Sequence, residues 1–442
     1  MWSLKIPKGI FIWYDNGMKH VVYWMSRALR TIDNQALFAA QQEAIKHKEP
    51  LLVFFNLYAD FPNANLRNMD FLLKGLAEVS LKLEKLNIPT LVMQGNVGSN
   101  LDKLNQQVEI RSIFTEHQVL RPVKVVHEQV GAWAFQNRIS FTKINTACVI
   151  PVWIASPKLE FSAKTIRNKI MSQYVPYLEQ TYPLVSHPYP SPIKERFTVK
   201  DAELILSKSN WKKLSLSALK PGEDAANELL DDFIQHRLQN YDRRNEIDSQ
   251  GQSHLSAYLH FGMISPLKMI RAVKETNHPN ATLFIEEAMV RRELAENYCY
   301  YQEHYDSLKG AWSWAQATLN NHRLDQRTYL YTLEDFENAR THDELWNTCQ
   351  KMVVKDGYLH SYLRMYWAKM VLFWSESPEA AIKILIHLND TYFLDGRDPN
   401  GYTGIMWSVA AVHDRPWFDK PVHGLIRAMG KDGTLKKTKI KL

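Results

Sequence analysis

The first 145 residues alternate short apolar runs with longer amphipathic segments, and this alternation constrains the fold more than any other feature of the chain. The clearest apolar run is LLVFFN at 51–56, which is typical of a strand buried on both faces of a parallel sheet. Further strands are expected at 20–25, 88–95, 109–117 and 138–145, and helices at 33–47, at 71–86 and around 101–104. Strands that alternate with helices predict an α/β, Rossmann-like domain with a parallel sheet. The motif GxGxxG does not follow the first strand, so these residues do not specify a ligand.

The pattern changes after about residue 150. Residues 181–200 hold several prolines, which is typical of a linker. From Asp224 onward almost every segment has helical spacing, so an all-α domain is expected. We predict an N-terminal extension at 1–20, an α/β domain at 21–175, a linker at 176–223 and a helical domain at 224–442.

The charge balance and the cysteine content limit the classes of protein to which this chain can belong. The chain carries 54 Lys and Arg against 47 Asp and Glu, and its net charge of +7 favours a polyanionic partner. Five lysines near the C-terminus form either a solvated tail or a contact surface: Lys431, Lys436, Lys437, Lys439 and Lys441. The three cysteines lie far apart, so buried thiols in a reducing compartment are expected and a metal site is not. With no secretory signal and no window long enough to cross a bilayer, we expect a soluble intracellular protein without membrane attachment.

Residues 389–407 (NDTYFLDGRDPNGYTGIMW) form the most unusual polar stretch. Acidic and amide side chains crowd there among three glycines and a proline, and the run Asp-Pro-Asn-Gly is strong turn chemistry. One interpretation is a surface turn between two helices. The other is a polar loop that approaches a planar cofactor closely.

A second polar stretch covers residues 241–262. Ser253, His254 and Ser256 lie just before an apolar segment, and hydroxyls with free amides at a helix start can bind an anion. Arg243 and Arg244 could complete such a site. Ordinary helix capping with solvated arginines gives the same pattern.

Residues 281–306 mix glutamates with arginines at helical spacing. Such a pattern is typical of a solvated, salt-bridged helix face. A single glutamate facing a cavity, such as Glu287, would look the same.

Arg364 lies within the apolar segment 357–374. A guanidinium in such a place needs an acidic partner or an anionic ligand, and Asp395 is the available candidate. Trp367 and Trp374 are seven residues apart, about 10 Å along a helix axis. An aromatic stripe of this kind indicates core packing or, less commonly, an electron conduit.

Several motifs together resemble one family, the class II cyclobutane pyrimidine dimer DNA photolyases of the photolyase/cryptochrome superfamily. The resemblance runs from about Val21 to Met429, and its last block is long and irregular. The motifs are VVYWMSRALRTIDN (21–34), SHLSAYLHFGMISP (253–266), VRRELAENYCYY (290–301), LWN (345–347), LRMYWAKMVLFWSESPE (363–379) and LNDTYFLDGRDPNGYTGIMWS (388–408).

The resemblance implies an N-terminal α/β domain and a C-terminal all-helical domain that binds FAD in a folded form. It implies that Asn389 faces flavin N5 and that Arg364 pairs with Asp395 beside the ring. It also suggests a deazaflavin antenna in the N-terminal domain, which no residue there demonstrates. The residues that it assigns to FAD are Tyr241, Arg244, Ser253, His254, Leu255, Ser256, Arg364, Asn389, Asp395, Gly396 and Arg397.

The same resemblance assigns electron transfer to four aromatic residues. Indoles can carry a transient radical cation, so a packed series of them makes physical sense. The tryptophans are Trp346, Trp367 and Trp374, and Tyr331 extends the series.

Light-dependent repair of a pyrimidine dimer flipped out of duplex DNA is the activity that the resemblance implies, with no net redox change. Glu287, Met365 and Trp407 would form the lesion pocket, with Glu287 bonded to a pyrimidine carbonyl and Trp407 packed on the flipped bases. Asn389 would act at the flavin. The DNA contacts are expected from Arg244, Glu287, Arg291, Trp407, Arg415 and Arg427. Some relatives have Trp at position 291, whereas Arg291 matches the commoner form.

Two alternatives remain, and a monomer is expected in each. A cryptochrome-like photoreceptor would share the fold, the flavin and the tryptophans. Repair of the six-four photoproduct calls for a histidine pair, and the motifs around His360 and His413 do not follow that branch.

Overall fold

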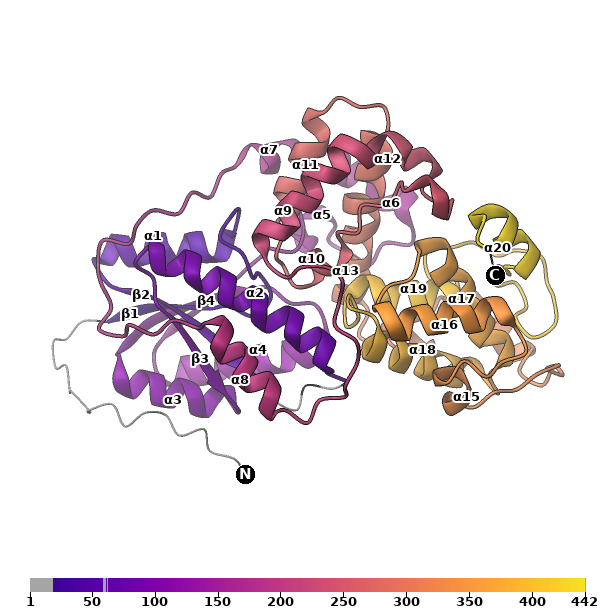
Figure 1. Cartoon of the computed structure of the whole chain (residues 1–442), viewed down its shortest axis with the longest axis horizontal. Helices are drawn as coiled ribbons and strands as arrows, with labels where there is room; N and C mark the ends of the chain where they lie inside the picture. The colour runs from indigo at the N-terminus through magenta and orange to yellow at the C-terminus, as the bar shows by residue number, and fades with distance from the viewer. Residues whose placement is uncertain (1–18, 59–60, 62, 442) are drawn as a thin grey trace.

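The computed structural model describes residues 19–58, 61 and 63–441. Most of the predicted N-terminal extension, residues 1–18, lies outside this range. A parallel sheet forms the first part of the fold, as predicted (Figure 1). It has five strands in the order β3-β2-β1-β4-β5. The strands are β1 His20–Trp24, β2 Leu51–Leu57, β3 Thr90–Gln94, β4 Ile110–Glu116 and β5 Ser140–Ile144.

Four helices connect these strands, and alternation along the strands separates the two faces of the sheet. They are α1 Gln35–His47, α2 Leu66–Lys85, α3 Val97–Gln107 and α4 Arg121–Gln136. Val53 of β2 packs in the core that includes α1 and α2, whereas Leu52 and Phe54 pack with α3 and α4. Asn34, Asn65 and Asn96 each cap the following helix with a side-chain oxygen. The sheet is therefore covered on both faces, which explains its continuous apolar strands.

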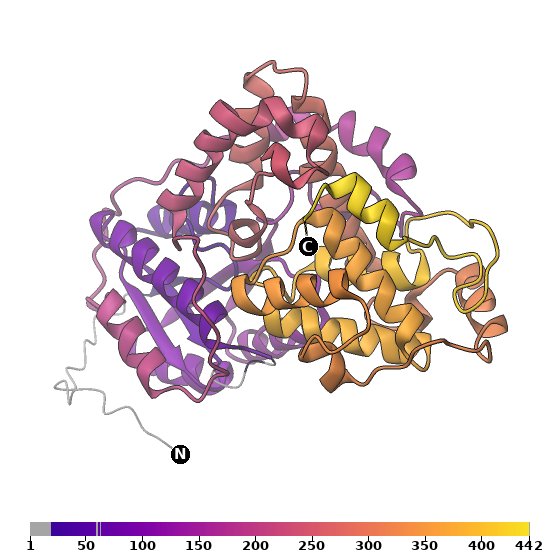
Figure 2. The same cartoon turned by 45° about the vertical axis from the view of Figure 1, so that its right-hand side comes forward.

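The rest of the described chain consists of helices and the loops that connect them. Its helices are α5 Val152–Ala155, α6 Ala163–Met171, α7 Tyr174–Glu179, α8 Val199–Lys208, α9 Glu223–Asp232, α10 Ser256–His260, α11 Pro266–Glu275, α12 Ala281–Ile285, α13 Arg292–Tyr301, α14 Ser313–Asn321, α15 Leu333–Glu337, α16 Glu344–Asp356, α17 Ser361–Trp374, α18 Pro378–Tyr392, α19 Pro399–Ala410 and α20 Lys431–Thr438. Two π-helical turns, Phe233–Arg237 and Glu286–Arg291, continue α9 and α12. Helices α16 to α20 form one body beside the sheet, and α20 packs against α17 (Figures 1 and 2).

Two local expectations need correction. The segment predicted as a linker, 176–223, contains α8, which packs on α2 of the sheet domain. Helices were expected almost throughout the chain after Asp224, but residues 411–430 have none. This segment contains Pro416 and Pro421, and proline interrupts helices. The domain boundaries themselves stay a prediction.

Buried polar contacts join the sheet domain to the helices. Arg67 of α2 donates to the carbonyl oxygens of Val353, Val354 and Lys355 at the end of α16. The guanidinium thus binds carbonyl oxygens of the last helical turn; the Val353 oxygen also accepts from the Gly357 N–H. Within the described residues, no helix is both long and apolar enough to cross a membrane.

Candidate functional site

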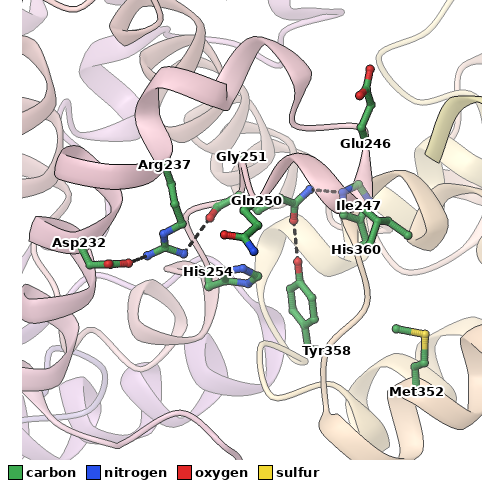
Figure 3. Close-up of a pocket in the computed structure, with 11 residues that line it drawn as sticks. Asp232, Arg237, Glu246, Ile247, Gln250, Gly251, His254, Met352, Tyr358 and His360 are labelled. Atoms are coloured by element: carbon green, nitrogen blue, oxygen red, sulfur yellow. Dashed lines mark hydrogen bonds and ion pairs between the residues drawn. The ribbon is translucent and has the colours of Figure 1, made fainter. Parts of the chain in front are cut away.

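A cavity of about 400 Å³ opens between the segment around Gly251 and the start of α17 (Figure 3). This volume is in the range of small-molecule and cofactor sites. The lining side chains are charged, polar, aromatic and apolar: Asp232, Arg237, Glu246, Ile247, Gln250, Gln252, His254, Met352, Tyr358 and His360.

Gln252 contacts two other side chains of the cavity wall. Its Oε1 accepts a hydrogen bond of 2.6 Å from the Tyr358 hydroxyl, and its Nε2 lies 3.1 Å from His360 Nε2 (Figure 3). Arg237 pairs with Asp232 at 2.6 Å, yet its buried Nε has no hydrogen-bond partner among the described residues. A buried, unsatisfied guanidinium nitrogen at a cavity wall fits a ligand with acceptor oxygens, such as a dinucleotide cofactor.

Arg364 and Asp395 form the predicted ion pair. Arg364 Nη1 lies 3.0 Å from Asp395 Oδ1, and Nη2 donates to Asn389 Oδ1 at 2.5 Å. The Asn389 amide also donates to Asp390 at 2.8 Å and carries a second amide hydrogen. The Arg364 backbone N–H donates to the carbonyl oxygen of the cavity residue His360 at 2.9 Å, one helical turn earlier. Burial raises the pKa of the Tyr358 hydroxyl in the cavity wall, and the Asp395 carboxylate raises it further. The ion pair and the cavity are therefore neighbours.

Two glycines of 389–407 allow the chain to close tightly around Asn389. A Cβ at Gly396 would lie 2.5 Å from the Asn389 carbonyl oxygen, and one at Gly401 would lie 2.9 Å from Asn389 Nδ2. Both positions therefore require glycine, and the stretch is more than a surface turn. Asp398 caps α19 and also pairs with Arg27 of the sheet domain at 3.3 Å.

Arg397 lies in the same loop but its side chain points elsewhere. Its φ is 61°, and its guanidinium donates to the carbonyl oxygens of Asn63 and Asp390. The side chain thus reaches the loop that precedes α2 and does not join the Arg364–Asp395 pair.

The stretch around Ser253 differs from the expected helix start. Helix α10 begins at Ser256 and has five residues, so its dipole is small. His254 has a φ of 59° and lines the cavity, and Leu255 is buried. An anion bound here would be held mainly by backbone N–H groups and side chains, and only weakly by the helix dipole.

Arg244 connects Tyr241 with Glu287. Its guanidinium lies 4.9 Å from the Tyr241 ring centroid, and Nη2 lies 3.0 Å from Glu287 Oε1. Glu287 belongs to the π-helical turn Glu286–Arg291, a geometry that is frequent at functional sites. Arg291 is exposed and pairs with Glu286 at 3.3 Å.

The predicted aromatic series is contiguous. The rings of Trp367 and Trp346 stack at 6.3 Å with an interplanar angle of 7°, and Trp374 lies 6.3 Å beyond Trp346. Tyr331 lies 6.0 Å from Trp374. At the other end, Phe393 contacts Trp367 at 5.6 Å and lies 3.9 Å from the Arg364 guanidinium. The series therefore runs from the Arg364–Asp395 pair toward the surface.

Trp407 of α19 packs on a buried lysine of α17. Lys369 Nζ lies 4.3 Å from the Trp407 ring centroid and 3.1 Å from the Ser408 carbonyl oxygen. Burial lowers the pKa of Lys369 from 10.5 to about 7, Asp414 opposes this shift and Arg427 adds to it. Met365 is half-buried on the same helix.

This buried lysine predicts a pH-dependent stability difference. The pKa of Lys369 is lower in the folded state than in the unfolded state, so between about pH 7 and 10 the unfolded chain binds one more proton than the folded protein. The free energy of unfolding therefore rises with pH in this range, by roughly 1 kcal/mol per pH unit. Lys369→Met should remove this rise, so its stability advantage over the parent chain should be largest near pH 7 and shrink toward pH 10. Urea unfolding at several pH values tests this, with exposed Lys383→Met as the control. A constant difference across that range would contradict the expectation.

Arg415 and Arg427 both contact one indole, that of Trp417. Their guanidinium carbons are 5.1 and 4.7 Å from the Trp417 ring centroid, and the neighbouring Phe418 is 81% exposed. Both arginines are exposed. The irregular segment 411–430 therefore presents two cations and aromatic rings to solvent, which suits a nucleic-acid contact.

Some residues of the candidate site were not predicted from the sequence. Gln252, Tyr358 and Arg237 line the cavity but were not assigned to it. A signal did exist for Gln252, because it directly precedes Ser253. Trp417 was missed although it lies between two arginines that were predicted.

Known proteins are similar to this chain over most of its length. A family model for DNA photolyase matches residues 21–181. The deoxyribodipyrimidine photo-lyase of Potorous tridactylus is 40% identical over 427 residues, which cover 94% of this chain and 79% of that protein. The Synechocystis sp. PCC6803 cryptochrome has a TM-score of 0.75 at 16% identity, over 96% of this chain and 87% of that one. An archaeal photolyase from Sulfolobus tokodaii, described with two FAD molecules, has a TM-score of 0.72 at 16% identity, over 95% and 87%.

The fold is that of the photolyase/cryptochrome superfamily, with a parallel-sheet domain followed by helices. The chain is an enzyme of the DNA photolyase family.

Proposed function

We propose that this protein repairs cyclobutane pyrimidine dimers in DNA with light, as a class II member of its family. The observation that carries the proposal is the continuous row of indoles from Trp374 to Trp367. Phe393 connects this row to Arg364, which lies one helical turn after His360 of the cofactor-sized cavity. These indoles also belong to the hydrophobic core, but the photolyase relatives of the chain and the cofactor-sized cavity favour an electron path to a redox cofactor at the inner end of the row.

The cavity residues fit FAD. Arg237, Gln252 and His254 would offer polar contacts to phosphate and ribose oxygens. Asn389 and Arg364 would offer hydrogen-bond donors to the flavin ring, and Asp395 holds Arg364 in place. Reduced, deprotonated FAD would supply a one-electron donor on light excitation. A deazaflavin antenna in the sheet domain stays a prediction.

The lesion side is assigned to Glu287, Met365 and Trp407, which lie on three separate elements. Glu287 would exchange its Arg244 contact for the lesion carbonyl. Arg415 and Arg427 would then contact the phosphates around the flipped dimer.

A cryptochrome-like photoreceptor is the second candidate, since the superfamily fold serves both functions. Fluorescence anisotropy with three labelled duplexes separates the two: one intact, one with a thymine dimer and one with a six-four photoproduct. We expect the dimer duplex to bind more tightly than both others, with affinity that falls as salt rises. Equal affinity for all three would contradict the proposal.

A further inference from the structure

Tyr331 and His342 hydrogen-bond to each other at the outer end of the tryptophan row. The His342 backbone N–H donates to the Tyr331 hydroxyl oxygen at 2.9 Å, and that oxygen lies 2.9 Å from His342 Nδ1. Because the backbone amide can only donate, the single hydroxyl hydrogen is free to point at Nδ1. Nδ1 then acts as the acceptor, and the neutral imidazole carries its proton on Nε2.

Both residues contact the last tryptophan. The Trp374 ring lies 6.0 Å from Tyr331 and 4.8 Å from His342, and the Tyr331 backbone N–H donates to the Trp374 carbonyl oxygen at 3.0 Å. Tyr329 stacks on the His342 ring at 3.6 Å, with an interplanar angle of 15°. His342 is exposed, so a proton that it receives can leave to solvent.

A tyrosine gives up an electron readily only if its proton leaves with it, and a base within hydrogen-bond reach makes this concerted loss fast. The base must be neutral before the step. Burial lowers the pKa of His342 below 6.5; nearby Lys431 lowers it further and Asp343 opposes them. At neutral pH the imidazole is therefore free to accept a proton. The ring-facing groups Tyr329, Tyr331 and Trp374 are uncharged.

We propose that His342 is the proton acceptor that lets Tyr331 reduce the oxidised Trp374. One electron passes from Tyr331 to the Trp374 radical cation, which becomes neutral tryptophan. The hydroxyl O–H bond of Tyr331 breaks and an Nδ1–H bond forms, leaving a neutral tyrosyl radical and an imidazolium. Charge is conserved. The oxidant that starts the series is a light-excited oxidised flavin, so the proposal rests on the proposed function.

Once the proton has moved, return of the electron to Tyr331 requires the proton as well. The imidazolium loses it to solvent, so the separated charges persist longer than they would on tryptophan alone. His342 thus acts on the yield of flavin photoreduction and not on the dimer.

Flash spectroscopy of the FAD-loaded, oxidised protein tests the proposal. In the parent protein the tryptophan radical should decay as a tyrosyl radical appears. This step should be slower in D₂O, and it should slow as pH falls and His342 becomes protonated. His342→Gln keeps a hydrogen-bond acceptor but is not basic, so the step should slow about 100-fold and lose its pH dependence. Tyr331→Phe should form no tyrosyl radical, and Tyr329→Phe should behave as the parent.

An unchanged rate and pH profile in His342→Gln would overturn the proposal, as would a parent protein whose tryptophan radical forms without any tyrosyl radical. A parent protein that forms no tryptophan radical would overturn the electron path of the proposed function as well. The ¹⁵N signals of His342 give a check that needs no variant: we expect the tautomer with hydrogen on Nε2, and the opposite tautomer would contradict the hydrogen-bond assignment.

Discussion

Trp367→Phe should abolish light-driven reduction of the bound flavin while leaving repair by pre-reduced protein largely intact. Trp367 is the indole nearest to the Arg364–Asp395 pair, through Phe393. A benzene ring is far harder to oxidise than an indole, so the rate should fall at least ~100-fold, a barrier increase of roughly 3 kcal/mol. The measurement is the loss of oxidised-flavin absorbance under continuous blue light with an external thiol.

Correct folding of this variant must be checked, because the Trp367 side chain is 1% exposed and the smaller Phe leaves a cavity. Trp133→Phe in α4 is a matched control, since its indole lies in the sheet domain and bonds Asp102. The variant should bind FAD in a stoichiometry equal to that of the control. Photoreduction at the normal rate would contradict the electron path, and loss of repair by pre-reduced protein would show that Trp367 has a different role.

Glu287→Ala should lower the rate of dimer splitting while FAD stays bound. A hydrogen bond to a charged group contributes about 1.5–3 kcal/mol, so its loss from the dimer radical anion should slow the step roughly 10- to 100-fold. Glu287→Gln keeps an N–H donor and should retain more activity than the alanine variant. Repair per absorbed photon, measured with pre-reduced protein, is the appropriate readout.

The Arg244 contact adds a control to this series. Glu287→Ala leaves Arg244 without its 3.0 Å partner, so DNA or FAD binding could change for that reason alone. Arg244→Lys with Glu287 intact measures that effect separately. If Glu287→Ala repairs as fast as the parent, Glu287 does not contact the lesion.

Much of the sheet domain follows from local pattern. The strand predicted at 51–56 is β2 Leu51–Leu57, and the helix predicted at 33–47 is α1 Gln35–His47. Helix α4 was not predicted, because only His127, Val130 and Ala134 of its 16 residues are buried and its apolar stripe is short.

The candidate site depends more on contacts between distant segments. The pairing of Arg364 with Asp395 could be predicted, because a guanidinium in an apolar helix requires a partner. That Trp346 fills the gap between Trp367 and Trp374 could not be predicted from spacing, since it comes from another helix. The direction in which the Arg397 side chain extends could not be predicted either, because a left-handed φ at a non-glycine residue has little signature in the sequence.

Recovery of intact thymine from a dimer-containing duplex tests the central claim most directly. The protein, loaded with FAD and reduced beforehand, is mixed with the duplex, and the thymine content is measured after blue light and after an equal time in the dark. We expect dimers to be converted to thymine in the light only, with many dimers repaired per protein molecule. Equal thymine in light and dark, with the duplex bound and the flavin reduced, would contradict the assignment of this chain as a dimer-repairing photolyase.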